Sequence, residues 1–182
     1  MSLKPLAFAL LFAAAPAYAA DYAQAPSSTL TFATKYQGEV FSGRLPGFSS
    51  KISFDPTNLT TAKFDIVIPL AGVTTANAER DDTLKGADFF SISKFPQARY
   101  TATRFRSMGG NNYAADGTLT LRGVSKPVTL VFTWTAGAKP VLSGKATVKR
   151  LDFGVGGGDW ADISIIPNEV AVSTKVNLVP AK

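Results

Sequence analysis

Residues 128–134 read VTLVFTW, and the polarity of their side chains alternates along the chain. Val128, Leu130, Phe132 and Trp134 share one parity, and threonine occupies two of the three positions between them. A period of two residues is typical of a β-strand, because successive side chains point to opposite faces. The stretch therefore predicts a strand with one buried face and one face in water.

The same alternation recurs along most of the chain. It is found at residues 29–32, 51–54, 63–68, 118–122 and 170–178. Turn sequences rich in glycine, proline, aspartate and asparagine separate these runs, as at 55–58 and 109–112. About eight short strands at this spacing predict an all-β domain, either a sandwich or an up-and-down barrel.

One segment departs from the period of two. Residues 77–86 read NAERDDTLKG and predict a short helix, with Asn77 as its N-cap, Lys85 near its end and Gly86 after it. An aromatic cluster follows at Phe89, Phe90 and Phe95. We expect the segment 84–95 either to act as a lid where a ligand enters or to seal one end of the domain permanently.

The N-terminus has the three parts of a secretory signal. Lys4 supplies a positive charge, residues 5–15 are almost entirely apolar, and residues 17–19 read AYA. Signal peptidase recognises this pattern of small residues, so cleavage is expected after Ala19. A second apolar run of membrane length is absent, so we expect no transmembrane segment in the remaining domain, residues 20–182.

The amino-acid composition argues against several classes of protein function. The chain has no cysteine and no histidine, so disulfides, histidine bases and the commonest metal ligands are all missing. Its 19 basic and 13 acidic residues give a net charge of +6, but the basic residues are scattered rather than gathered in a stripe. We therefore predict neither an enzyme, nor a metal site, nor a nucleic-acid surface.

Several segments resemble one family in their order and spacing. The most specific is ERDDTLKGADFF at 79–90, followed by KFP at 94–96. The others are STLTF at 28–32, FDP at 54–56, GTLTLRGVSKPV at 117–128 and RLDFGVG at 150–156. Together they resemble the YceI-like family of periplasmic lipid-binding proteins along nearly the whole mature chain.

The resemblance implies a single antiparallel, lipocalin-like β-barrel with one short helix and a periplasmic location. It also implies an apolar channel for an isoprenoid lipid, such as an isoprenoid quinone or a polyprenyl phosphate, with no other cofactor. The side chains expected to bind this lipid are Phe32, Phe54, Phe64, Ile66, Ile68, Leu84, Phe89, Phe90, Tyr100, Leu119, Leu121, Phe132, Trp134, Val148 and Val172.

An alternative function stays open, because the inward side chains of a small barrel often fill it completely. With a closed core, the protein would be a non-catalytic accessory of a membrane redox system or a stress-related interaction protein. A homodimer is the one self-association that we consider.

Charged residues near the expected channel also allow more than one role. Arg150 shares its parity with inward residues, so we expect either an ion pair with Asp152 or another carboxylate, or a contact with a ligand head group. The acids of segment 79–88 are expected mainly to complement the helix dipole. Arg80 is expected to pair with one of them.

Overall fold

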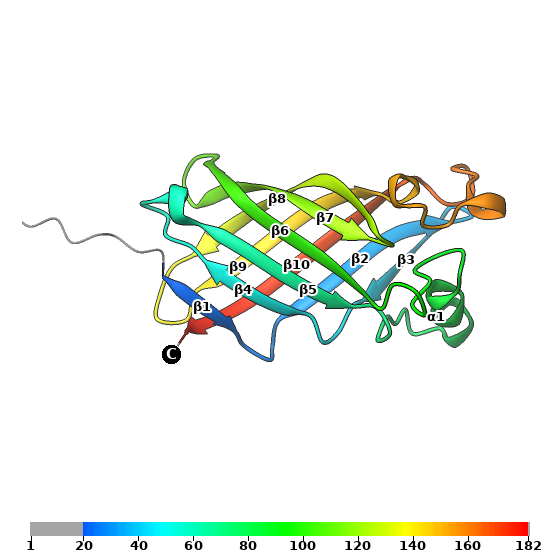
Figure 1. The fold of residues 1–182 in the computed structure, drawn as a ribbon, viewed down its shortest axis with the longest axis horizontal. Helices are drawn as coiled ribbons and strands as arrows, with labels where there is room; N and C mark the ends of the chain where they lie inside the picture. Colours follow the sequence, from blue (N-terminus) through cyan, green and yellow to red (C-terminus); the bar gives the residue numbers. More distant parts are fainter. Residues whose placement is uncertain (1–19, 182) are drawn as a thin grey trace, which may run out of the picture.

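The computed structural model describes residues 20–181 (Figure 1). The predicted signal peptide, residues 1–19, lies outside the described residues. The strands are β1 (Asp21–Gln24), β2 (Thr29–Tyr36), β3 (Glu39–Arg44), β4 (Ser49–Ser53), β5 (Lys63–Pro69), β6 (Gln97–Ser107), β7 (Asn112–Leu121), β8 (Val124–Thr135), β9 (Val141–Lys149) and β10 (Glu169–Pro180).

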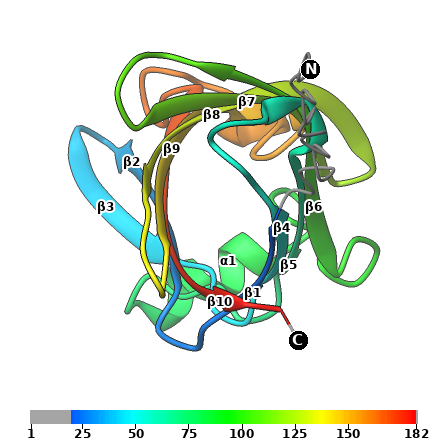
Figure 2. The ribbon, with the colours of Figure 1, turned by 90° about the vertical axis from the view of Figure 1, so that its left-hand side faces the viewer.

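Eight of these strands form a closed ring. β1 and β4 to β10 follow one another around the sheet, and every neighbouring pair is antiparallel. β1 closes the ring because Tyr22 lies opposite Ile52 of β4 on one side and Pro180 of β10 on the other. Figure 2 shows this ring from the end where β1 begins and β10 ends. The prediction of an antiparallel barrel of about eight strands is confirmed.

The remaining two strands form a hairpin that extends one part of the wall. β10 is twelve residues long, so its last part pairs with β1 while Ala171 to Lys175 pair with β2. β2 in turn pairs with β3. The outer edge of β3 carries one described bridge, between Arg44 and Thr74. The wall is therefore interrupted between β3 and β5, at the same end of the molecule as the helix (Figure 1).

The predicted short helix is present as α1 (Ala78–Lys85). Asn77 is its N-cap, because the side-chain oxygen of Asn77 accepts a hydrogen bond from the amide of Arg80 at 2.9 Å. Three 3₁₀ turns complete the structure: η1 (Leu59–Thr61), η2 (Arg150–Phe153) and η3 (Gly158–Trp160). Among the described residues, no helix has both the length and the apolar composition needed to span a membrane.

The end of the barrel opposite α1 is closed by aromatic side chains. Phe54 is fully buried at its centre, with its ring centroid 4.8 Å from that of Trp134 and 5.1 Å from that of Tyr113. Phe64 is equally buried, and its centroid lies 5.3 Å from that of Phe132. Such tilted and edge-on pairs add to the stabilisation from burial. This closed-end cluster fills the barrel here as an ordinary core.

Candidate functional site

The other half of the barrel is hollow. An apolar cavity of about 450 Å³ lies between the strands and opens at the α1 end, where exposed residues of the helix line it. Val148, Val172 and Ile66 point into it from three strands and yet are only half-buried, because they face open space rather than other side chains. Alternation along the strands produced this wall, with apolar residues inside and threonine, serine or charged residues outside. The interior is thus open and lined by hydrocarbon.

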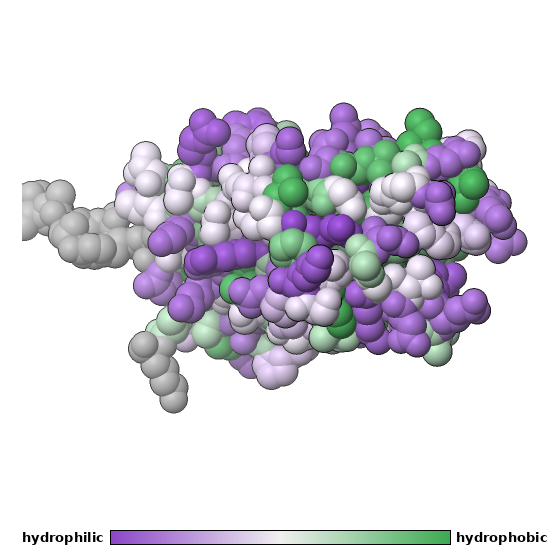
Figure 3. Space-filling model, turned by 45° about the vertical axis from the view of Figure 1, so that its right-hand side comes forward, coloured by the Kyte–Doolittle hydropathy of each residue, from purple (hydrophilic) through white to green (hydrophobic). Residues whose placement is uncertain are grey.

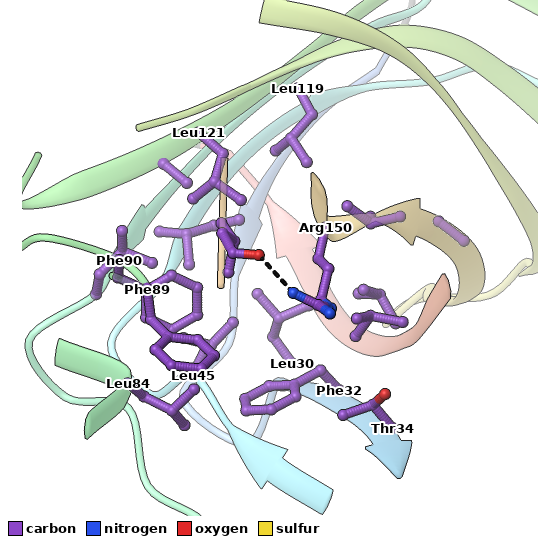
Figure 4. A pocket seen from close by; sticks show the side chains of 18 of the residues that line it. Leu30, Phe32, Thr34, Leu45, Leu84, Phe89, Phe90, Leu119, Leu121 and Arg150 are labelled. Carbon is purple, nitrogen blue, oxygen red and sulfur yellow. Dashed lines mark hydrogen bonds between the residues drawn. The ribbon is translucent and has the colours of Figure 1, made fainter. Parts of the chain in front are cut away.

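Eleven of the fifteen residues predicted to bind lipid line this cavity. They come from six strands and from the segment that follows β5, and several are labelled in Figure 4. They are Phe32, Ile66, Ile68, Leu84, Phe89, Phe90, Tyr100, Leu119, Leu121, Val148 and Val172. The structure brings these side chains together around one space, and their contact with a ligand stays a prediction.

The other four residues do not line the cavity. Phe54, Phe64, Phe132 and Trp134 belong to the closed-end cluster, where each is at most 4% exposed. Their inward orientation was predicted correctly, but their place in the channel was not. The reason is that a period of two reports which face of the sheet a side chain occupies, and says nothing of its depth along the barrel axis.

Tyr100 separates the filled half from the hollow half. Its hydroxyl donates to the carbonyl oxygen of Ala115 at 2.8 Å, and burial raises the pKa of this phenol far above its usual value. The ring lies across Gly117 on the neighbouring strand, where a Cβ atom would be only 2.4 Å from Tyr100 Cζ and 2.6 Å from the carbonyl oxygen of Thr101. Gly117 therefore gives Tyr100 the room to cross the barrel.

We expect Gly117→Ala to lower the free energy of unfolding by about 1–3 kcal/mol, because the added methyl group meets a backbone oxygen that cannot move aside. Denaturant unfolding measures this loss. Gly157→Ala is the matched control, because a Cβ atom at Gly157 meets nothing within 4 Å and its φ is −82°. Equal stability of the two variants would show that the approach of Tyr100 is not tight.

Arg150 has a structural role that differs from both predicted roles. Its guanidinium is buried and donates five hydrogen bonds, all of them to backbone carbonyl oxygens. The acceptors are Val155, Gly156, Trp160, Ile166 and Pro167, and Figure 4 marks one of these bonds. An arginine side chain has five N–H donors, so none remains for a ligand head group.

The predicted carboxylate partner of Arg150 is therefore wrong. Asp152 is exposed, and no described ion pair involves Arg150. Burial without a counter-ion lowers the pKa of the guanidinium. The five carbonyl oxygens supply the partial negative charge that a carboxylate would otherwise provide. The result is an irregular segment, residues 150–168, tied into a fixed cover over one side of the cavity.

Polar lining side chains gather at the mouth of the cavity, on α1 and β2. Arg80 lies there, with Cζ 4.5 Å from the ring centroid of Phe41. Its Nε atom donates to the hydroxyl of Thr75 at 2.9 Å. The acid expected as partner for Arg80 is not found among the described ion pairs, so that prediction is wrong. Thr34 on β2 has the one buried side-chain oxygen without a hydrogen-bond partner in residues 20–181.

Asp81 anchors the start of α1. One oxygen of its carboxylate accepts from both the amide and the hydroxyl of Thr75, each at 2.6 Å. These bonds lower the pKa of Asp81 below its ordinary value of 3.8, and the bond from the Thr75 hydroxyl has the largest effect. The acid thus fixes the loop before the helix in addition to complementing the helix dipole.

We expect this anchor to open in acid. Because the folded-state pKa of Asp81 is lowered, its stabilising effect is complete above about pH 4 and disappears as the pH falls through the folded-state value. Hydrogen exchange of the Thr75 amide, corrected for its intrinsic pH dependence, measures the opening. Asp81→Asn keeps an acceptor oxygen and should remove the pH dependence. The same acid response in both proteins would contradict this account.

The segment after α1 is held against the barrel by three hydrogen bonds, which Arg122 and Gly156 donate. The guanidinium of Arg122 donates to the carbonyl oxygens of Ala87, at 2.8 Å, and of Phe89. The amide of Gly156 donates to the carbonyl oxygen of Asp88 at 2.7 Å. Phe89 is buried by these contacts and lines the cavity. The segment forms one wall of the site in this structure, and its action as a lid stays a prediction.

Sequence reasoning missed part of the lining. Leu30 and Leu130 lie on predicted strands at the inward parity, so the alternation already contained the signal for them. Trp160 and Ile166 come from the irregular segment 150–168, for which no periodicity exists. Their positions depend on the hydrogen bonds of Arg150, which the sequence does not display.

The outer surface differs from the cavity. It is mainly hydrophilic in the view of Figure 3, with hydrophobic side chains gathered in patches. The most exposed large apolar residues include Val40 on β3 and Ile163 in the irregular segment, at 70% and 61% exposure. Small apolar patches of this kind are common on protein surfaces. The distinctive apolar surface of the molecule is therefore the one inside the barrel.

Comparison with known proteins agrees with this architecture. The model of the YceI-like domain matches residues 22–178. The chain belongs to the YceI-like family. A relative from Yersinia pestis, a UPF0312 protein, is 34% identical over 185 residues, which cover 96% of this chain and 94% of that protein.

Solved structures with the same fold are also found. BcnA of Burkholderia cenocepacia superposes with a TM-score of 0.79 and 28% identity, covering 82% of this chain and 95% of BcnA. A domain from Saccharophagus degradans, described as polyisoprenoid-binding, superposes with a TM-score of 0.69 over 90% of this chain and 99% of that domain. Its identity is 16%, so it supports the YceI-like fold alone.

Proposed function

We propose that this protein is a periplasmic binding or carrier protein for an isoprenoid lipid, which lies with its hydrocarbon chain in the barrel cavity. The observation that carries the proposal is the apolar cavity of about 450 Å³, open at the α1 end and closed by aromatic rings at the other. Its volume falls within the roughly 300–1,000 Å³ of small-molecule sites. A blind apolar cavity of this kind fits a flexible hydrocarbon chain.

Burial alone supplies the binding energy. Each CH₂ group that leaves water for an apolar site contributes about 0.8 kcal/mol, so a few isoprene units suffice for strong binding. The deep polar groups, Tyr100 and Arg150, are engaged by backbone carbonyls. Binding without catalysis therefore fits this interior best. The Saccharophagus degradans domain, which has the same fold, is itself described as polyisoprenoid-binding.

The open interior favours the carrier over the accessory protein with a closed core. An accessory protein with a closed core requires the inward side chains to fill the barrel, whereas those on β5, β9 and β10 face empty space. The leader-like residues 1–19 support export to the periplasm. Detection of the processed chain in the periplasmic fraction of a bacterial host tests the location.

Native mass spectrometry of the full chain, expressed with its own N-terminus and purified without detergent, tests the ligand. We expect a bound species that solvent extraction releases and that has the mass of a prenyl lipid. Protein that purifies empty and also fails to take up added prenyl lipid would disprove the proposal.

A further inference from the structure

The polar head of a bound ligand has few partners inside the cavity. Tyr100 and Arg150 donate to backbone carbonyls, as described above, and the hydroxyl of Thr174 donates to the carbonyl oxygen of Thr29 at 2.9 Å. A head group buried at this depth would lose its bonds to water without replacement. The head must therefore lie at the mouth, where α1 contributes to the lining.

The helix presents two charged side chains to the mouth. The side-chain oxygen of Asn77 accepts the capping bond, and the hydroxyl of Thr83 donates to the carbonyl oxygen of Glu79 at 2.9 Å. Glu79 and Arg80 line the cavity as well. Neither takes part in an ion pair among the described residues.

Arg80 is held in place and still has donors available. Nε donates to the hydroxyl of Thr75 at 2.9 Å, and Nη2 donates to the carbonyl oxygen of Thr75 at 3.4 Å. The cation–π contact with Phe41, with Cζ 4.5 Å from the ring centroid, holds the guanidinium at the cavity wall. Nη1 has no hydrogen-bond partner in the described part of the chain. A guanidinium placed in this way can donate to an acceptor on a ligand.

We propose that Arg80 binds the head group of the lipid and that Glu79 makes this mouth select a neutral, hydrogen-bond-accepting head over a phosphate. The inference rests on the proposed function. A hydroxyl or carbonyl oxygen accepts from Arg80 without bringing charge beside Glu79. A phosphate monoester carries a charge of about −1.5 to −2 at neutral pH, so its attraction to Arg80 is opposed by the neighbouring carboxylate.

The net charge of α1 supports this selection. The helix contains three acids, Glu79, Asp81 and Asp82, against two bases, Arg80 and Lys85. Lys85 lies 3.6 Å from Asp82 and is outside the cavity lining, so it does not offset Glu79 at the mouth. Asp81 remains charged near neutral pH, because its bonds to Thr75 favour the ionised form.

Farnesol and farnesyl phosphate, two lipids with the same chain and different heads, test the inference. Competition against a fluorescent lipid at low ionic strength should show that the full-length protein binds farnesol at least about three-fold more tightly, with a difference that shrinks in salt. Equal or tighter binding of farnesyl phosphate would overturn the inference. Failure of both lipids to bind would instead overturn the proposed function.

Substitutions assign the selection to the two side chains. Glu79→Gln should strengthen binding of farnesyl phosphate relative to farnesol about two- to five-fold, whereas Arg80→Gln should weaken binding of farnesol. Asp82→Asn is the matched control, because it removes the same charge from the same helix outside the cavity lining. The role of Glu79 would be contradicted if Asp82→Asn changed the binding of farnesyl phosphate as much as Glu79→Gln does. The role of Arg80 would be contradicted if Arg80→Gln bound farnesol as tightly as the wild type. Thermal unfolding verifies that each variant is folded.

Discussion

Replacement of Arg150 by methionine is expected to lower the free energy of unfolding by about 3–5 kcal/mol. The substitution keeps an unbranched side chain of similar length, but it removes every donor that five carbonyl oxygens use. A buried acceptor left without a donor costs about 1–3 kcal/mol. Val155, Gly156 and Ile166 are buried, so at least three of the acceptors lose their partner away from water. Denaturant unfolding monitored by circular dichroism measures the loss.

Arg99→Met is the control, because it replaces an exposed arginine by methionine and leaves the buried hydrogen bonds of Arg150 intact. Arg99 lies on the outer face of β6, where it binds both carboxylate oxygens of Asp65, at 2.8 and 2.7 Å. Its side chain is 55% exposed, so solvent screens this ion pair and its contribution to stability is small. A similar loss in the two variants would show that Arg150 does not organise the irregular segment.

The effect of Arg150→Met should also reach the cavity. Trp160 and Ile166 line the cavity from the segment that Arg150 holds, and the ring centroid of Trp160 lies 5.4 Å from that of Phe89. Release of this segment exposes apolar surface on both sides of the contact. We therefore expect the variant to lose lipid binding at denaturant concentrations well below its global unfolding.

The comparison of Phe32 with Phe132 shows how far alternation predicts this fold. Both phenylalanines are inward on predicted strands, and both are buried in the structure. Phe32 lines the cavity, whereas Phe132 belongs to the closed-end cluster. Strand identity and facing follow from residues two apart along one chain. Depth depends on the register and tilt of neighbouring strands, which are set by the whole ring.

Charged residues were less predictable than apolar ones. The sequence indicated that Arg150 is inward, because it continues the parity of Val148, but its partners are carbonyls of an irregular segment that no local pattern describes. Arg80 was placed correctly on a helix, and its contacts with Thr75 and Phe41 join three separate parts of the chain. Polar contacts of this kind depend on tertiary geometry, so the sequence alone could not indicate the position of the proposed head-group site.

A phenylalanine in place of Ala146 is expected to weaken lipid binding about 100-fold while the barrel remains folded. Ala146 lines the cavity on β9, opposite Val172 of β10, and is only half-buried because it faces open space. The new ring can therefore occupy the cavity without overpacking a filled core. Displacement of about three or four buried CH₂ groups, at about 0.8 kcal/mol each, corresponds to roughly this loss of affinity.

Ala171→Phe is the matched control for this substitution. Ala171 lies on β10 between Thr147 and Ala33, and its side chain is exposed on the outer face of the same wall. Titration with farnesol should give wild-type affinity for Ala171→Phe and a loss for Ala146→Phe, with thermal unfolding showing that both variants are folded. Retained affinity in folded Ala146→Phe would mean that the lipid binds elsewhere. The pair thus distinguishes the inside of the barrel from its outer surface by one side chain on each face.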